Sequence, residues 1–235
     1  MKVIIDRQAL RRRATIAHTA SLGGLLVLLG SVAVSLWSPE FNWISSLMLF
    51  AGGVIAMGGI FYANRWVKKP RPEFILDQSL KGLSDQHRLY HYTPFAEHLM
   101  LTPNGMVVLE TVNLEGQFTY KDGRWKQKMT AGRAMRYIVE ERLGNPIADA
   151  QTRVDAVQNH LLADLLDDVK IPVQALVVFT HPMAVVKVDN PPMPVFAVDK
   201  LAKKIPHPGA RLPNDVYAQI RQGLDGLFGS LESSG

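Results

Sequence analysis

The stretch EHLMLTPNGMVVLETVNLEG, residues 97–116, decides the fold of the larger part of the chain. Its two apolar runs, 98–101 and 106–112, flank the sequence Pro-Asn-Gly at 103–105. Asn-Gly between apolar runs is typical of a β-hairpin, because the tight turn needs positive φ at both of its central positions. The sequence therefore predicts two antiparallel strands joined by this turn.

The neighbouring segments extend this hairpin into a sheet. Residues 88–92 precede it as a further predicted strand. Residues 118–120 and 124–126 flank Asp122-Gly123, which is a second turn of the same kind. We interpret this part of the chain as a meander of antiparallel strands.

Helical signals lie before and after the meander. Pro72 can open a short helix, and Asn145 is a good cap for a long helix that begins at Pro146. Residues 173–179 form a continuous apolar run, which is typical of a strand covered on both faces and central in its sheet. Shorter elements are predicted at 184–188 and 195–198 (strands), at 199–204 (a short helix) and from Asn214 to about 229 (a last helix). Together they predict an α/β or α+β domain with a mixed sheet.

Charged residues are unevenly distributed along the chain. Of its 235 residues, 26 are Lys or Arg and 21 are Asp or Glu. Residues 1–71 hold nine basic and two acidic side chains, whereas residues 72–235 hold 17 basic and 19 acidic ones. We therefore do not expect nucleic acid as a partner, because its binding needs a surplus of clustered cations. Cysteine is absent, which excludes disulfides, thiolate zinc sites and cysteine nucleophiles.

The N-terminal part of the chain is strongly apolar. Residues 14–39 carry no formal charge, and residues 42–64 repeat the pattern after a short connection. A bilayer core needs about 20 helical residues, so each stretch is long enough to cross it. We predict two transmembrane helices within residues 14–66. The alternative is a secretory signal peptide that is cleaved near Ala33.

Basic clusters at both ends of this hairpin predict its orientation. Arg11, Arg12 and Arg13 precede the first helix, basic residues at 65–71 follow the second, and Glu40 is the one charge between the helices. By the positive-inside rule both termini are cytoplasmic, in a bacterial-type inner membrane or a plasma membrane. Membrane lipids are then expected partners, because such clusters attract anionic headgroups. The predicted plan is a basic cytoplasmic N-terminus (1–13), two transmembrane helices (14–66), a proline-containing linker (67–72) and a cytoplasmic domain (73–235).

Small residues recur at four-residue spacing in both predicted helices, as in Ala20 with Gly24 and Gly52 with Ala56. Such residues let helix backbones approach closely. They are equally compatible with packing of the hairpin on itself and with packing against another membrane-protein subunit. His18 lies one turn inside the first helix, and we interpret it as facing the headgroups.

Residues 97–116 resemble the nuclease-related domain (NERD) family, which usually reads Ile-Asp-His, a hairpin, then Ile-Glu-x-Lys-Asn and a glycine. The resemblance covers roughly residues 73–205 and implies a fold like that of restriction endonucleases. Its further points are Trp125, the Asn145-Pro146 helix start, Gln151 and the strand that ends Val178-Phe179-Thr180. The resemblance implies a site in which two carboxylates hold a divalent metal and a lysine assists the attacking water or the phosphate.

The resemblance places Glu97 and Glu110 at the two acidic positions, as candidate catalytic residues and as ligands of Mg²⁺ or Mn²⁺. On strands joined by a tight turn they can meet across the sheet, and a lysine two residues past Glu110 would share its face. The chain departs from the family here, because Glu97 replaces Asp and Val112 replaces the lysine. An isopropyl group cannot supply a cation, although Lys121 or Lys126 could in principle reach back.

Two further groups of residues are open to a functional interpretation. Residues 121–136 form a basic stretch, which we interpret as a solvated hairpin facing anionic lipid. His87, His91 and His98 suggest a three-histidine metal site, but we interpret them as surface or packing residues. The basic residues are Lys121, Arg124, Lys126, Lys128, Arg133 and Arg136.

These observations favour a membrane-anchored, non-catalytic domain that serves as an interaction module or as an accessory subunit of a membrane protein complex. On that hypothesis no cofactor is expected, and other membrane-protein subunits are partners. One alternative is a metal-dependent DNA or RNA nuclease that uses Glu97 and Glu110 with Mg²⁺ or Mn²⁺. The other is a sensor that faces anionic lipid.

Overall fold

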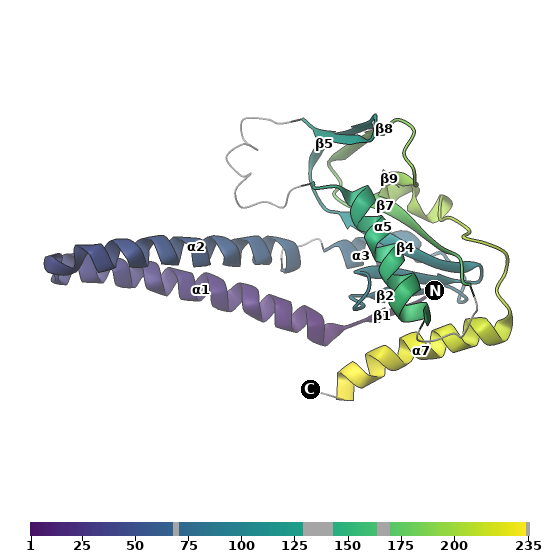
Figure 1. Cartoon of the computed structure of the whole chain (residues 1–235), viewed down its shortest axis with the longest axis horizontal. Coiled ribbons are helices and arrows are strands. Elements are labelled where there is room, and N and C mark those ends of the chain that lie inside the picture. The colour runs from purple at the N-terminus through teal and green to yellow at the C-terminus, as the bar shows by residue number, and fades with distance from the viewer. Residues whose placement is uncertain (68–70, 129–142, 164–169, 234–235) are drawn as a thin grey trace. The chain divides into compact units, whose positions relative to one another are not determined.

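The fold is a mixed α/β arrangement in which two long apolar helices precede a mixed-sheet domain, as predicted (Figure 1). The structure is a computed structural model that describes residues 1–67, 71–128, 143–163 and 170–233. The chain divides into a helical unit, Ala9–Lys69, and a sheet unit that holds Met1–Gln8, Pro70–Lys128 and Leu143–Gly235. The basic residues Arg133 and Arg136 lie outside the described residues.

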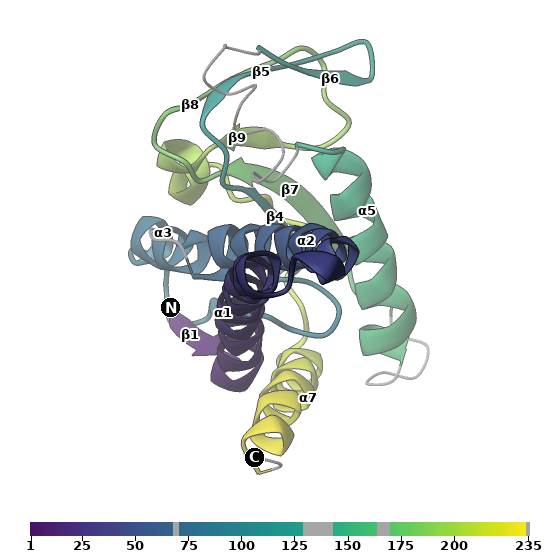
Figure 2. The same ribbon diagram turned by 90° about the vertical axis from the view of Figure 1, so that its left-hand side faces the viewer.

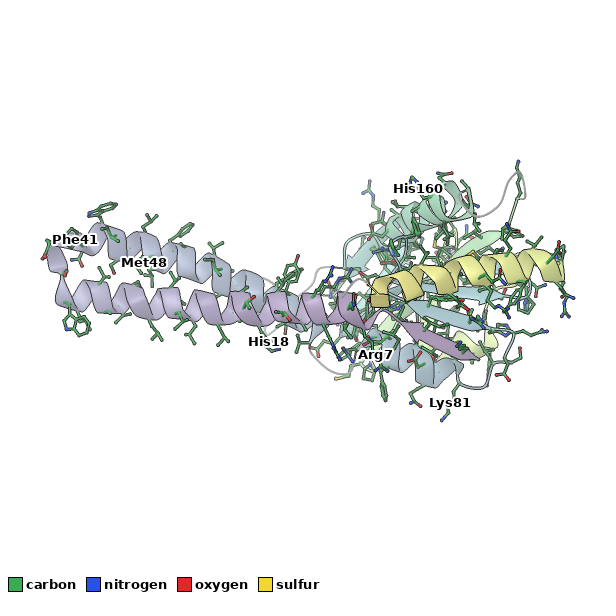
Figure 3. All side chains as sticks on the ribbon, turned by 90° about the horizontal axis from the view of Figure 1, so that it is seen from below. Arg7, His18, Phe41, Met48, Lys81 and His160 are labelled. Atoms are coloured by element: carbon green, nitrogen blue, oxygen red, sulfur yellow. The ribbon has the colours of Figure 1, made fainter. Side chains whose placement is uncertain are left out.

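The helical unit consists of two antiparallel helices, α1 (Arg7–Trp37) and α2 (Asn42–Trp66), joined by the short helix η1 (Pro39–Phe41). Within them, Leu10–Trp37 and Asn42–Asn64 are each long and apolar enough to cross a membrane, and only 11% of either apolar window is buried. Large apolar side chains project outward along both helices, with Phe41 at the connection (Figure 3).

The two helices pack on each other through small residues. Gly24 lies against the backbone of Ala56, so that a side chain at Gly24 would collide with it. Gly59 faces Ser21 in the same way. Of the two uses proposed for the small residues, packing of the hairpin on itself is thus observed.

The main sheet has six strands in the order β1-β2-β3-β4-β7-β9. Strands β2, β3 and β4 are antiparallel neighbours, whereas β1 with β2, β4 with β7, and β7 with β9 are parallel pairs. The predicted central place of residues 173–179 is confirmed. The strands are β1 (Lys2–Ile5), β2 (Arg88–His91), β3 (His98–Thr102), β4 (Gly105–Val112), β7 (Val173–Phe179) and β9 (Val195–Ala197). Sequence analysis did not predict β1, whose apolar signal is only the short run Val3-Ile4-Ile5.

A second sheet is formed by β5 (Gly116–Lys121), β6 (Arg124–Gln127) and β8 (Ala184–Val188), in the order β6-β5-β8. The predicted meander is therefore wrong beyond β4, since β5 does not pair with β4. The physical reason is that β3 and β7 already occupy both edges of β4. Strand β5 instead pairs antiparallel with β6 and parallel with β8.

Both faces of the main sheet are covered, and α3 and α5 lie on opposite sides of it (Figure 2). Helix α5 (Pro146–Ala156) continues as the π-helical segment η2 (Val157–Leu162) and packs on β4 and β7, together with α7 (Asn214–Ser233). Helix α3 (Pro72–Leu80) and the 3-10 helix η3 (Val198–Lys203) cover the other face. The predicted helix start is confirmed, because the Asn145 side chain accepts a hydrogen bond from the Ala148 N–H.

The two predicted turns differ in their backbone conformation. Asp122 and Gly123 both have positive φ, of 51° and 75°, as predicted. In the first turn only Gly105 has positive φ, of 133°, so the prediction of two such residues is wrong there. The loop begins at Pro103, whose ring holds φ near −65°, and the left-handed residue follows it at the start of β4.

Candidate functional site

The β3–β4 hairpin brings the two candidate acidic residues together. Leu99 pairs with Val108, and the same register places Glu97, just before β3, opposite Glu110. Both side chains lie on the sheet face that α5 covers, because Leu99 and Val108 belong to the core on that face. The structure thus shows that the two carboxylates meet across the hairpin.

A cation from α5 lies between these carboxylates. The Nε–H of Arg153 donates a hydrogen bond to Glu110 Oε2 at 2.7 Å. Its Nη2 lies 3.8 Å from Glu97 Oε1. The Glu110 side chain is only 13% exposed, and that of Arg153 29%, so water screens this pair weakly. We call Glu97, Glu110 and Arg153 the acid–arginine cluster.

Arg153 was missed in the sequence analysis. Its neighbour Val154 faces the core, and the packing of α5 on β4 carries Arg153 to the acidic pair. The available signal was the amphipathic pattern of α5, which predicts a helix against the sheet but not its register on β4.

The position at which the family carries its lysine is apolar and buried. Val112 lies two residues past Glu110 on the same face, where it is 7% exposed and belongs to the core beneath α5. Lys121 and Lys126, the two lysines considered as replacements, have exposed side chains on the second sheet. Within the described part of the chain, Arg153 is therefore the cation that contacts Glu97 and Glu110.

Burial sets the charge state of Glu110. It raises the pKa of this carboxyl to about 7, and the negative charges of Glu97 and Asp149 act in the same direction, whereas Arg153 acts against them. Near neutral pH the Glu110 carboxyl therefore carries a proton for much of the time. A protonated carboxyl is a poor ligand for a divalent cation.

Tyr92 connects the acid–arginine cluster to the start of α3. Its hydroxyl donates a hydrogen bond to Glu73 Oε2 at 2.8 Å, and Arg71 Nε lies 2.8 Å from the other carboxylate oxygen of Glu73. The Tyr92 N–H donates to the carbonyl of Glu97 at 2.6 Å, and its φ is 65°. Burial, followed by the charge of Glu73, raises the pKa of the Tyr92 hydroxyl, so it remains a donor.

The histidines form a separate buried pair on the opposite sheet face. His91 Nε2 lies 3.0 Å from Asp77 Oδ1, and His91 Nδ1 lies 2.7 Å from His98 Nδ1. Because a carboxylate only accepts, His91 Nε2 is the donor to Asp77. His87 instead contacts the Ser84 hydroxyl. The three histidines do not converge, and the interpretation of His91 and His98 as packing residues is confirmed.

The described donor set does not fit a magnesium or manganese site. Such ions are held by several oxygen ligands in near-octahedral geometry. Here the carboxylates of Glu97 and Glu110 converge on a guanidinium instead. Among residues 1–67, 71–128, 143–163 and 170–233, no group of three or more His, Asp or Glu side chains is arranged to hold a metal ion.

Comparison with known proteins identifies a family model for part of the chain. Residues 71–180 match the family model of the nuclease-related domain (NERD). The chain carries a nuclease-related domain. The match runs from the start of α3 to the residue after β7, so the nuclease-related domain includes the whole acid–arginine cluster and excludes the two apolar helices. No curated protein and no solved structure matches the chain.

Proposed function

We propose that this protein is a membrane-anchored nuclease-related domain that does not cut nucleic acid. It serves as an interaction module or as an accessory subunit of a membrane protein complex. The observation that carries the proposal is the acid–arginine cluster, in which Arg153 contacts both carboxylates while Val112 stands at the lysine position. The guanidinium neutralises the charge that attracts a divalent cation, and it stays protonated, so it cannot act as a general base.

The membrane anchor in this proposal is the hairpin of α1 and α2. Its support is the length of both helices and their outward apolar side chains, such as Leu36 and Phe50, which are 76% and 73% exposed. Basic clusters precede the first helix and follow the second, which favours cytoplasmic termini. Lipids and other membrane-protein subunits are then its partners.

A nuclease assay tests the non-catalytic part. The purified full-length protein is incubated with double-stranded DNA, single-stranded DNA and RNA in Mg²⁺ and in Mn²⁺, beside the Glu110→Ala variant. We expect the two proteins to give the same background.

The competing candidate is a metal-dependent nuclease, favoured by the position of Glu97 opposite Glu110. If the protein is such a nuclease, cleavage of DNA or RNA should require the metal and should disappear in Glu110→Ala. That result would overturn the proposal.

Purification in a mild detergent tests the accessory role. We expect membrane-protein subunits to co-purify at a fixed stoichiometry and to be lost when the two apolar helices are replaced by an unrelated transmembrane hairpin. Recovery of the protein without any stoichiometric partner would contradict this part of the proposal and leave the nuclease result unaffected.

A further inference from the structure

The second sheet, β6-β5-β8, has one face that packs on the core and one exposed face. Phe118 and Tyr120 of β5 are buried, and Trp125, Val186 and Val188 pack beside them against the core. Side chains alternate along a strand, so the intervening residues point to the opposite face. That second face is exposed on all three strands.

The exposed face carries a cluster of cations that strand register brings together. Thr119 at its centre pairs with Lys126 of β6 on one side and with Lys187 of β8 on the other. Lys121 pairs with Arg124, and the Lys128 N–H donates to the Gln117 carbonyl. The basic face therefore consists of Lys121, Arg124, Lys126, Lys128 and Lys187, all exposed. Lys187 joins it from a part of the chain that is distant in sequence.

No ion pair neutralises this basic face within the described part of the chain. Among the described residues, the acids beside it are Asp122 in the turn and Asp189 after β8, both exposed. Five cations against these two carboxylates leave a positive surface, although residues 72–235 as a whole are mildly acidic. Such a local positive surface attracts anionic partners.

We propose that the basic face binds the anionic phospholipid headgroups of the membrane in which the hairpin is anchored. This inference rests on the proposed membrane anchor. The linker between Trp66 and Pro72 spans at most about 20 Å when extended, so the domain stays beside the bilayer. Such tethering gives the headgroups a high effective concentration at the basic face.

The chemistry of the face favours lipid over nucleic acid. Binding of single strands relies on aromatic side chains that stack on bases. The aromatic residues of this sheet, Phe118, Tyr120 and Trp125, point to the core instead. A broad three-stranded surface with five long cations beside Gln117, Thr119 and Val185 fits a layer of charged headgroups, which needs no base contacts.

The absence of cysteine permits a site-specific probe. The full-length Thr119→Cys protein is labelled with a nitroxide and reconstituted into nanodiscs of phosphatidylcholine alone or with phosphatidylglycerol. Collision with a water-soluble paramagnetic reagent then reports whether the face is covered. We expect at least a twofold lower accessibility in the anionic discs, and we expect high salt to reverse it.

Matched triple variants test the role of the basic face. Changing Arg124, Lys126 and Lys187 to Gln is expected to abolish the dependence on phosphatidylglycerol, since each cation near the surface contributes roughly a fivefold effect on binding. The control changes Lys200, Lys203 and Lys204 to Gln, which removes the same charge from exposed positions in and beside η3. It is expected to behave like the parent.

Three results would overturn the inference. Equal accessibility in both kinds of disc would do so while leaving the anchor intact. So would protection of Thr119→Cys by an added oligonucleotide in phosphatidylcholine discs without protection by anionic lipid, which would assign the face to nucleic acid. Failure of the full chain to enter nanodiscs would instead refute the anchor, and with it the basis of this inference.

Discussion

Arg153 alters the consequence of losing the family's lysine. Val112 removes a cation from β4, yet α5 supplies another that contacts Glu110 at 2.7 Å. The two cations are not equivalent, because a guanidinium binds carboxylates through a planar fork and does not release a proton near neutral pH. A pair of carboxylates held this way is satisfied internally, as a structural ion pair is.

The raised pKa of Glu110 predicts how stability changes with pH. Its value of about 7 lies above the ordinary 4.5, so the folded protein binds this proton more tightly than the unfolded chain does. The stabilisation that protonated Glu110 gives to the folded state is therefore complete below about pH 4.5 and is lost as the pH rises towards 7. Its upper limit is roughly 3.5 kcal/mol, at about 1.4 kcal/mol for each pKa unit.

Thermal unfolding of Glu110→Gln between pH 4.5 and 8 measures this contribution. We expect the variant to lose the decrease in stability that the parent shows towards neutral pH. Asp155→Asn, which changes an exposed carboxylate of the same helix, is the control and should keep the parent's profile. Superimposable profiles for Glu110→Gln and the parent would show that the pKa of Glu110 is not raised.

Tyr92 gives a second prediction at the scale of single residues. Tyr92→Phe removes the hydrogen bond to the buried Glu73 carboxylate and should lower the free energy of unfolding by about 1–3 kcal/mol. Tyr217→Phe, whose hydroxyl donates to the exposed Gln86 carbonyl, should cost about 1 kcal/mol or less. Denaturant titration of both variants checks the difference, and equal losses would contradict the role given to Tyr92.

Single elements were predictable where the signal is local. Asn145 with Pro146 marks the start of α5, Asp122-Gly123 marks a turn, and the apolar run at 173–179 marks the central strand. Partners that come from distant segments were not predictable. Strand β4 pairs with β7, which follows more than sixty residues later in the chain. The hydrophobic pattern of a strand does not specify which distant strand it pairs with.

The candidate site shows the same division. The meeting of Glu97 and Glu110 follows from the hairpin register, which the turn sequence predicts. The arrival of Arg153 depends on how far α5 is shifted along β4, which packing decides and residue spacing does not. Tyr92 and Glu73 were also missed, because their contact joins a strand end to a helix start.

Gly105 tests the turn that positions Glu110. Its φ of 133° strains any other residue, and an added Cβ would collide with the Pro172 carbonyl. Gly105→Ala should therefore lower the free energy of unfolding by roughly 1–3 kcal/mol. Gly82→Ala has open space and should change it by about 0.5 kcal/mol or less. Equal melting temperatures for the two variants would refute the strained geometry.

The proposed membrane hairpin and the nuclease-related domain make a two-part molecule with a predicted orientation. In intact cells, Glu40→Cys, between the two helices, should react with a membrane-impermeant maleimide. Lys81→Cys, in the domain, should react only after permeabilisation. The chain has no native cysteine, so each label is unique. The reverse labelling pattern would refute cytoplasmic termini.

The most direct test of the central claim is a manganese titration of the full-length protein, followed by electron paramagnetic resonance of the free ion. If Arg153 stands in place of a metal, the parent should not bind Mn²⁺ at the acidic pair. Arg153→Gln, which removes the guanidinium from Glu97 and Glu110, should bind it at least about tenfold more tightly at pH 8.5, where Glu110 can release its proton although the substitution raises its pKa further. Stoichiometric binding of Mn²⁺ by the parent that is lost in Glu110→Ala would contradict the account.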